Sequence, residues 1–255
     1  MKHTLIVIGL LAVAFSSIAE PPKGYKLVWS DEFDGEKLDD AKWGFHYLGK
    51  RHDAINVRDA VRLDGKGHLV ITTSKVEVNG KPEYHTAILE TRGKFEHTFG
   101  YWEARIQLQK QEGHWSAFWV MPAGKLGDPL GDPAKGGVEV DVMEYHSRWI
   151  DKAQHTLHWD GYGKDHKSTH GDSTTTGLHE GFHTFGVLWT KDKYMFDVDG
   201  KPVWETDKAV SQKPEYALLS LEVGKWAGDI ARATLPDAIL VDYVRVYDAP
   251  DAPAR

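Results

Sequence analysis

Residues 136–146 read GGVEVDVMEYH and place three carboxylates within six residues, separated only by Val and Met. Side chains alternate between the two faces of a β-strand, so Glu139 and Asp141 would share one face while Glu144 falls on the other. One extra residue, a β-bulge, would return Glu144 to the face of the other two, and bulges often re-aim a side chain beside an active site. Three acids on an otherwise apolar strand are costly unless they are used. This strand therefore predicts a functional site.

Short segments of β-favouring residues recur along the rest of the chain, and no long segment has helical periodicity. The predicted strands cover residues 68–73, 101–108, 115–121, 182–189 and 240–247. Asn-Gly at 79–80 and Asp-Gly at 199–200 are two-residue hairpin signals, and the second predicts a hairpin of residues 194–198 with 203–206. This many strands at short spacing indicates an all-β sandwich or barrel.

Length and composition narrow the classes of protein. The 255 residues suit one large β domain with a substantial core. The formal net charge of −7 disfavours a polyanionic partner, so we expect no nucleic-acid binding. The chain has ten Trp, ten Tyr and nine Phe. We expect most of these rings to fill the core and several to line a cleft and stack on sugar rings.

The N-terminus has the pattern of a secretory signal over residues 1–19. A basic start at Lys2 precedes an apolar run over residues 4–15, and Ser17-Ile18-Ala19 is a small-x-small cleavage site. The run is too short to span a bilayer comfortably, and no other segment is long enough. We expect a secreted or periplasmic protein with its domain in residues 20–255. The chain has no Cys, so no disulfide supports the fold in that compartment.

The spacing of the three acids suits acid–base chemistry on a sugar. If Glu139 and Glu144 face one cleft, their carboxyls can approach the ~5–5.5 Å separation of a retaining glycosidase. One would then attack the anomeric carbon while the other protonates the leaving oxygen. Asp141 could hydrogen-bond the nucleophile, since clustered carboxylates push their pKa values apart. A solvated strand face or a calcium site would explain the same acids, so the strand alone leaves these alternatives open.

The pattern Glu139-x-Asp141-x-x-Glu144 resembles the bulged ExDxxE signature of glycoside hydrolase family 16, on its laminarinase side. The resemblance extends through most of the chain, in the segments 29–33 (WSDEF), 100–106 (GYWEARI), 113–119 (GHWSAFW), 182–189 (FHTFGVLW) and 241–247 (VDYVRVY). It implies a β-jelly roll, a concanavalin A-like sandwich of two curved antiparallel sheets. The concave face would form an open groove for a polysaccharide.

The resemblance also implies roles for individual residues. Glu139 would be the nucleophile, Glu144 the general acid/base and Asp141 the assisting acid. Trp115 and Trp119 match cleft tryptophans, and Trp115 is the better candidate for a sugar platform. The other candidates for substrate contact are His158, Asn56, Arg58 and Trp226.

The same resemblance raises the question of calcium. The chemistry requires no cofactor, but many family members bind a structural Ca²⁺ on the convex side, and Asp242 matches the acid of the last strand that holds it. A hydrogen-bonded residue at a strand end explains Asp242 equally well. Three departures, at Ser116 and in residues 158–166 and 219–225, leave catalysis intact and the polysaccharide open.

One motif, at residues 179–183, suggests a zinc site instead. His179-Glu180-x-x-His183 matches a zinc-protease pattern that works only on a helix. Gly177 and Gly181 disfavour a helix, and in a strand the two histidines would lie about 13 Å apart. We therefore expect no zinc site here.

Three functions remain. The first is a secreted, retaining endo-glycosidase acting on a β-1,3- or β-1,3-1,4-glucan. The second is the same chemistry on a β-galactan such as agar, carrageenan or a mucin-type glycan; a sulfated substrate would need basic residues in the cleft. The available ones are Arg51, Arg58, Arg62, Arg92 and Arg148. The third is a lectin-like protein without catalysis, against which the complete acid triplet argues. We expect a monomer that binds a polysaccharide and no membrane.

Overall fold

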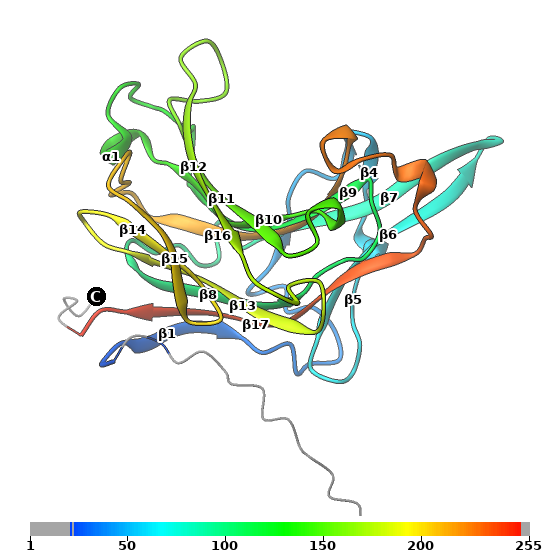
Figure 1. Ribbon diagram of the computed structural model, residues 1–255, viewed down its shortest axis with the longest axis horizontal. Helices are drawn as coiled ribbons and strands as arrows, with labels where there is room; N and C mark the ends of the chain where they lie inside the picture. The colour runs from blue at the N-terminus through cyan, green and yellow to red at the C-terminus, as the bar shows by residue number, and fades with distance from the viewer. Residues whose placement is uncertain (1–20, 22, 251–255) are drawn as a thin grey trace, which may run out of the picture.

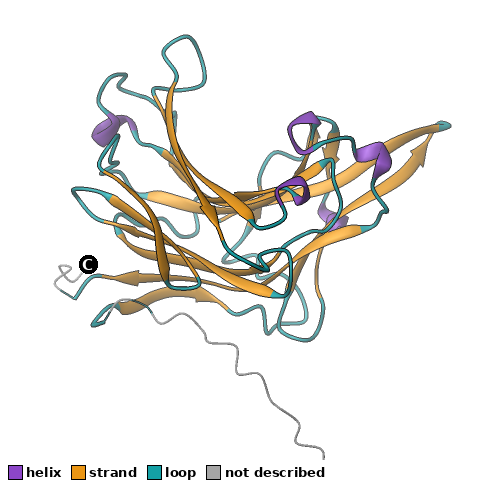
Figure 2. Ribbon diagram, in the orientation of Figure 1, coloured by secondary structure: helices purple, strands orange, loops and turns teal. Residues whose placement is uncertain are grey.

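The computed structural model describes residues 21 and 23–250, so the signal sequence predicted over residues 1–19 lies outside the described part. Strands make up most of the described chain (Figures 1 and 2). They form two antiparallel sheets packed face to face, which confirms the predicted jelly roll. The helical elements of the described residues are short: α1 (Pro133–Gly136), η1 (Arg58–Ala60), η2 (Ser147–Trp149), η3 (Lys225–Ala227) and η4 (Ile230–Arg232).

The outer sheet is built around the last strand, β17. Its strands are β1 (Lys26–Asp31), β5 (Val61–Leu63), β6 (Leu69–Val78), β8 (Gly100–Gln107), β13 (Phe182–Trp189), β14 (Tyr194–Val198), β15 (Lys201–Thr206) and β17 (Asp237–Asp248). β17 pairs with β8 along one edge and with β6 and then β1 along the other. β13, β14 and β15 continue the sheet beyond β8.

The inner sheet carries the acidic strand. Its strands are β2 (Gly44–Phe45), β7 (Lys81–Glu90), β16 (Glu215–Val223), β9 (His114–Pro122), β10 (Glu139–Tyr145), β11 (Lys152–Trp159) and β12 (Lys167–Thr174), in that spatial order. A small hairpin of β3 (Gly49–Arg51) and β4 (Ala54–Asn56) sits beside β7. The inner sheet is strongly curved, with β11 and β12 rising at one end (Figure 1).

Two of the turns that join these strands form where the sequence predicts them. Asn79 and Gly80 connect β6 to β7, and Asp199 and Gly200 connect β14 to β15, with φ between 52° and 71° at all four residues. Positive φ at both central positions defines the turn that matches strand twist, which is why Asn-Gly and Asp-Gly are preferred there. The predicted hairpin of residues 194–198 is therefore confirmed.

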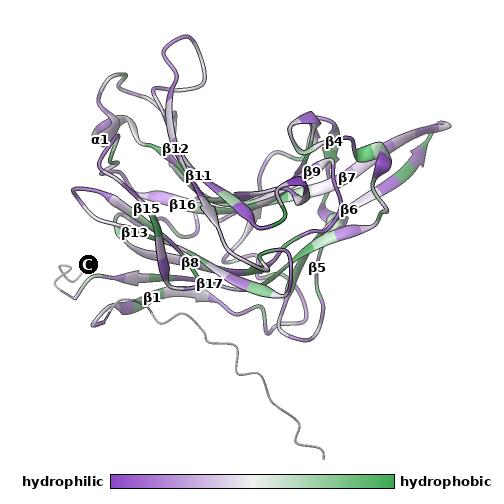
Figure 3. Cartoon of the chain, in the orientation of Figure 1, coloured by the Kyte–Doolittle hydropathy of each residue, from purple (hydrophilic) through white to green (hydrophobic). Residues whose placement is uncertain are grey.

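The core lies between the two sheets and is filled by alternate residues of each strand. In β8, Trp102, Ala104 and Ile106 are fully buried, as their spacing predicts. Phe118 of the inner-sheet strand β9 and Phe185 of the outer-sheet strand β13 belong to the same core cluster. Apolar residues are concentrated on the strands, whereas many connecting loops are hydrophilic (Figure 3). Within the described residues, no helix has the length and apolar character needed to cross a membrane.

Candidate active site

The acidic strand β10 contains the predicted bulge. Its register with β9 passes from Asp141, opposite Trp119, directly to Met143, opposite Phe118, and its register with β11 has the same irregularity. Val142 is thus the extra residue. It makes two consecutive side chains, those of Val142 and Met143, point into the core. Glu144 therefore returns to the face of β10 that carries Glu139 and Asp141, which we call the groove face, and the bulge prediction is confirmed.

A glycine determines how the chain enters this strand. Gly137 has φ 79°, and a Cβ at this position would lie 2.5 Å from the ring of Pro122 at the end of β9. Only glycine combines this conformation with so close an approach. The Gly136–Gly137 pair that precedes the acids therefore places β10 tightly against β9.

The three acids lie close together on the groove face. Glu139 and Asp141 are nearly buried, and Glu144 is partly exposed. His158 Nε2 lies 3.5 Å from Asp141 Oδ2, and Thr156 Oγ1 donates to Glu144 Oε2 at 3.4 Å. Both contacts come from β11, whose register places His158 opposite Glu139. The predicted triplet and His158 thus share one site.

Burial and mutual repulsion set the protonation of this triplet. Burial, followed by the charges of Glu144 and Glu139, raises the pKa of Asp141 well above its ordinary value. Burial, followed by the charge of Glu144, raises the pKa of Glu139 to about 8, and burial raises that of Glu144 to about 7. Asp141 is the least exposed of the three and keeps its proton over the widest pH range. Glu144 then holds a proton below about pH 7.

A fourth carboxylate, which the sequence did not reveal as a site residue, lies beside the triplet. Glu222 of β16 is nearly buried, and its negative charge raises the pKa of all three acids. It accepts from Arg51 Nε at 2.6 Å and lies 3.3 Å from His52 Nε2. Burial alone would raise the pKa of Glu222, but these partners lower it below its ordinary value. The departure noted at residues 219–225 was the available signal.

A cavity of about 490 Å³ opens beside Glu139. Its lining includes Trp119, Met121, Tyr162, Tyr216, Arg51 and Arg92. Both arginines have acidic partners, because Arg51 pairs with Glu222 and Arg92 Nη2 lies 3.1 Å from Glu90 Oε1. The cavity therefore combines aromatic and apolar walls with arginine charges that are each paired with a carboxylate.

A cluster of aromatic rings lies between β9, η2 and η3. Trp226 is 43% exposed, and its ring lies 5.5 Å from Trp115, 5.3 Å from Trp149 and 5.0 Å from His146, in edge-on contacts. Trp115 and Trp226 were predicted to contact substrate, whereas Trp149 and His146 were not. Neither has a recognisable local pattern, since both lie around a short 3₁₀ turn. The cluster offers flat apolar faces suited to sugar rings.

The remaining predicted contact residues have other partners. Trp119 is nearly buried in the groove floor, where its Nε1 donates to Ser220 Oγ at 3.2 Å. Asn56 is buried and its amide donates to the carbonyl of Tyr47 at 3.2 Å. The guanidinium of Arg58 lies 4.7 Å above the ring of Phe45. Neither Asn56 nor Arg58 lines the cavity beside Glu139, so their contact roles stay predictions.

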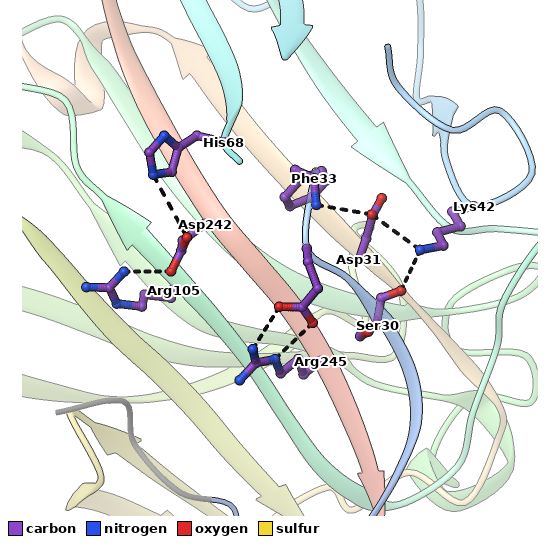
Figure 4. A network of polar contacts seen from close by, with 9 residues as sticks. Ser30, Asp31, Phe33, Lys42, His68, Arg105, Asp242 and Arg245 are labelled. Carbon is purple, nitrogen blue, oxygen red and sulfur yellow. Dashed lines mark hydrogen bonds and ion pairs between the residues drawn. The ribbon is translucent and has the colours of Figure 1, made fainter. Parts of the chain in front are cut away.

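The surroundings of Asp242 do not fit a calcium ion. Arg105 Nη1 donates to its Oδ2 at 2.6 Å, and His68 Nε2 lies 3.9 Å from its Oδ1 (Figure 4). The adjacent Glu32 is held by Arg245 through two bonds of 3.0 and 2.7 Å. Calcium requires six to eight oxygen ligands, and here cationic groups occupy the carboxylates. The metal role predicted for Asp242 gains no support.

The zinc-protease pattern is not realised either. His183 lies in β13, where its Nδ1 is 2.8 Å from Asp199 Oδ2, while His179 lies in a turn beside Asp151. Among residues 21 and 23–250, the set of acids and histidines close enough for a metal is Glu139, Asp141 and His158. Two members of that set belong to the acid triplet, and the third is its neighbour on β11.

Comparison with known proteins agrees with this geometry. The sequence model "Glycosyl hydrolases family 16" matches residues 48–245. The chain is 28% identical to the beta-glucanase of Rhodothermus marinus, over 97% of this chain and 94% of that protein. It is 28% identical to the keratan-sulfate endo-1,4-beta-galactosidase of Sphingobacterium multivorum, over 89% of this chain and 56% of that protein.

A solved structure shows the same architecture. The endo-beta-1,3-glucanase from Pyrococcus furiosus superposes with a TM-score of 0.74 at 29% identity, covering 88% of this chain and 94% of that one. Two other curated relatives are longer, and the chain spans 36% and 38% of their lengths. On the match over residues 48–245, the chain belongs to glycosyl hydrolase family 16.

Proposed function

We propose that this protein is a retaining endo-β-glycosidase in which Glu139 is the nucleophile, Glu144 the general acid/base and Asp141 the assisting acid. The observation that carries the proposal is the bulge at Val142, because it gathers the three carboxyls on one face of the groove. A double displacement requires two carboxyls that flank the scissile bond, one as nucleophile and one as general acid/base.

The roles are assigned by position in the ExDxxE pattern of the family. In its ionised form Glu139 attacks the anomeric carbon and forms a glycosyl-enzyme ester, and a proton on the neighbouring Asp141 would favour that ionised form. Glu144 gives its proton to the departing glycosidic oxygen, and then removes a proton from the water that hydrolyses the ester. A pKa of about 7 at Glu144 suits both tasks near neutral pH.

We propose a neutral β-1,3- or β-1,3-1,4-glucan as the substrate. The charge balance of the cavity supports this choice, since Arg51 and Arg92 are each paired with a buried carboxylate. Paired charges offer donors and acceptors to sugar hydroxyls without a net field that would select an anion. The likeness to a beta-glucanase over nearly the whole chain gives further support.

A β-galactan is the second candidate. The side chain of Arg92 is 50% exposed beside the cavity, so a sulfate ester could compete with Glu90 for it. The keratan-sulfate endo-1,4-beta-galactosidase, a relative along 89% of this chain, supports the same alternative.

A substrate panel tests the proposal and separates the two candidates. Laminarin, barley β-glucan, agarose, carrageenan and keratan sulfate are incubated with the protein, and reducing ends and product lengths are measured. Proton NMR of the first product must show the β anomer, because double displacement retains configuration. Initial formation of the α anomer would refute the mechanism, and cleavage of the galactans alone would refute the glucan assignment.

We also propose export, on the signal pattern of residues 1–19, and a monomeric state. N-terminal sequencing of protein recovered outside the cytoplasm tests the first. Size-exclusion chromatography with light scattering tests the second, for which the expected mass is close to that of one chain.

A further inference from the structure

A buried histidine from the neighbouring strand contacts the bulge in β10. His155 Nδ1 lies 2.7 Å from the carbonyl oxygen of Val142, and His155 Nε2 lies 2.9 Å from Ser173 Oγ on β12. A carbonyl can only accept, so Nδ1 carries the proton, and Nε2 accepts from the Ser173 hydroxyl. The two contacts therefore select one neutral tautomer.

The hydrogen bond from His155 satisfies a backbone carbonyl at the bulge. Val142 is the residue that the bulge adds, and it lies opposite no residue in the register with either neighbouring strand. A bulge interrupts the hydrogen-bond ladder at the extra residue, and a buried carbonyl requires a donor. Val142 and His155 are both fully buried. The imidazole thus supplies at this point the donor that a regular strand pair would supply from its backbone.

The imidazole is itself held from three sides. Ser173 fixes it from β12, and the ring of Phe196 on β14 lies 5.4 Å away in the core layer below. Burial lowers the pKa of His155, which keeps the ring neutral and keeps its single proton for Val142. A group fixed in this way can hold the bulge in one conformation.

We propose that His155 is a positioning residue that fixes the bulge and thereby aims Glu144 at the glycosidic oxygen. Val142 lies two residues before Glu144, so a shift of its carbonyl would move the acid. His155 lies on the core side of β11 and acts only through the strand. The inference rests on the role proposed above for Glu144 and extends it to the group that sets its geometry.

The test uses two substrates that differ in their need for an acid. One is the polysaccharide that the wild-type protein cleaves in the panel, and the other is the 2,4-dinitrophenyl glycoside of its disaccharide unit. Dinitrophenolate leaves without protonation, so its burst reports the first step without the acid. His155→Leu removes the donor, whereas His155→Asn keeps a donor at the position of Nδ1. His97→Leu is the matched control, because His97 is a nearly buried histidine whose side chain is bonded to Asp248 of the outer-sheet strand β17.

The expected results form a pattern. His155→Leu lowers kcat on the polysaccharide about 10²-fold, the effect of a small misplacement of a catalytic group, with KM and the dinitrophenolate burst nearly unchanged. His155→Asn restores most of the loss. Ser173→Ala gives a smaller loss of the same kind, and it decides the question if His155→Leu does not fold. His97→Leu lowers the melting temperature without this substrate dependence.

Other outcomes overturn the inference. An equal loss on both substrates, no loss, or the same pattern in His97→Leu would mean that His155 is only structural. Glu144→Gln is measured in parallel and must lose activity on the polysaccharide while keeping the burst. If Glu144→Gln cleaves the polysaccharide normally, the proposed function has failed, and the inference loses its basis with it. If Glu144→Gln behaves as expected and His155→Leu does not, the inference alone is refuted.

Discussion

Glu215 provides a test of whether burial in the core keeps a carboxyl protonated at neutral pH. It begins β16, is fully buried, and its Oε1 accepts from the backbone N–H of Val138, the residue before Glu139. Burial is the main cause that raises its pKa from 4.5 to about 8. The folded protein therefore keeps this carboxyl neutral over a range in which the unfolded chain has lost the proton. Replacing Glu215 with Gln removes the titration and keeps an oxygen for Val138.

The sign and size follow from proton linkage. Between pH 4.5 and 8 the unfolded chain binds fewer protons at this site than the folded protein, so the contribution of Glu215 to stability falls as pH rises. The slope is about 1.36 kcal/mol per pH unit, which gives a loss of about 4 kcal/mol between pH 5 and pH 8. The variant carries a fixed cost of about 1–3 kcal/mol for an imperfectly paired buried amide. That cost does not vary with pH.

Urea unfolding of both proteins at pH 5, 6, 7 and 8 measures the effect. The free energy of unfolding of the wild type minus that of Glu215→Gln should fall steadily over this range. Other buried carboxyls with raised pKa values, such as Glu103, are present in both proteins and cancel in the difference. A difference that stays constant with pH would show that Glu215 is ionised in the folded protein, and the account of its burial would be refuted.

Three further predictions concern the acids and the aromatic cluster beside them. Glu139→Gln should lower kcat by at least about 10²–10⁴-fold while the melting curve keeps its shape; retained cleavage of the polysaccharide would remove Glu139 as the nucleophile. Since Glu144 must hold its proton in the first step and its pKa is raised to about 7, kcat/KM should decline above that pH, and a rate that stays level to pH 9 would contradict the acid role. Trp226→Ala should raise KM for long oligosaccharides by roughly 10-fold or more, the equivalent of about 1.4 kcal/mol of lost stacking, with Leu130→Ala, another exposed apolar side chain, as the control that leaves KM unchanged.

Much of the fold could be predicted from the sequence because its determinants are local. The alternation of Trp102, Ala104 and Ile106 assigns one face of β8 to the core. The dipeptides at 79–80 and 199–200 form tight turns because their residues accept positive φ. The odd spacing between Asp141 and Glu144 predicted the bulge, since period-two alternation permits a shared face only with an added residue.

Contacts between distant segments could not be predicted in this way. Glu222 and Arg51 are 171 residues apart, and the close approach of β16 to the β3–β4 hairpin brings them together. Asp242 faces Arg105 because β17 lies beside β8, which is why a carboxylate that resembled a calcium ligand has an ion pair instead. No sequence pattern marked either pair.

The sequence by itself determined the class of fold, the strand that carries the acids and the need for a bulge within that strand. Turn conformation and side-chain alternation depend on neighbouring residues, so a single stretch of chain contains them. The tertiary structure alone decided which groups surround the acids: His155 at the bulge, Glu222 beside the triplet and the rings that join Trp226. These contacts depend on how the strands pair and curve into a groove, because that pairing brings together side chains that no local interaction connects.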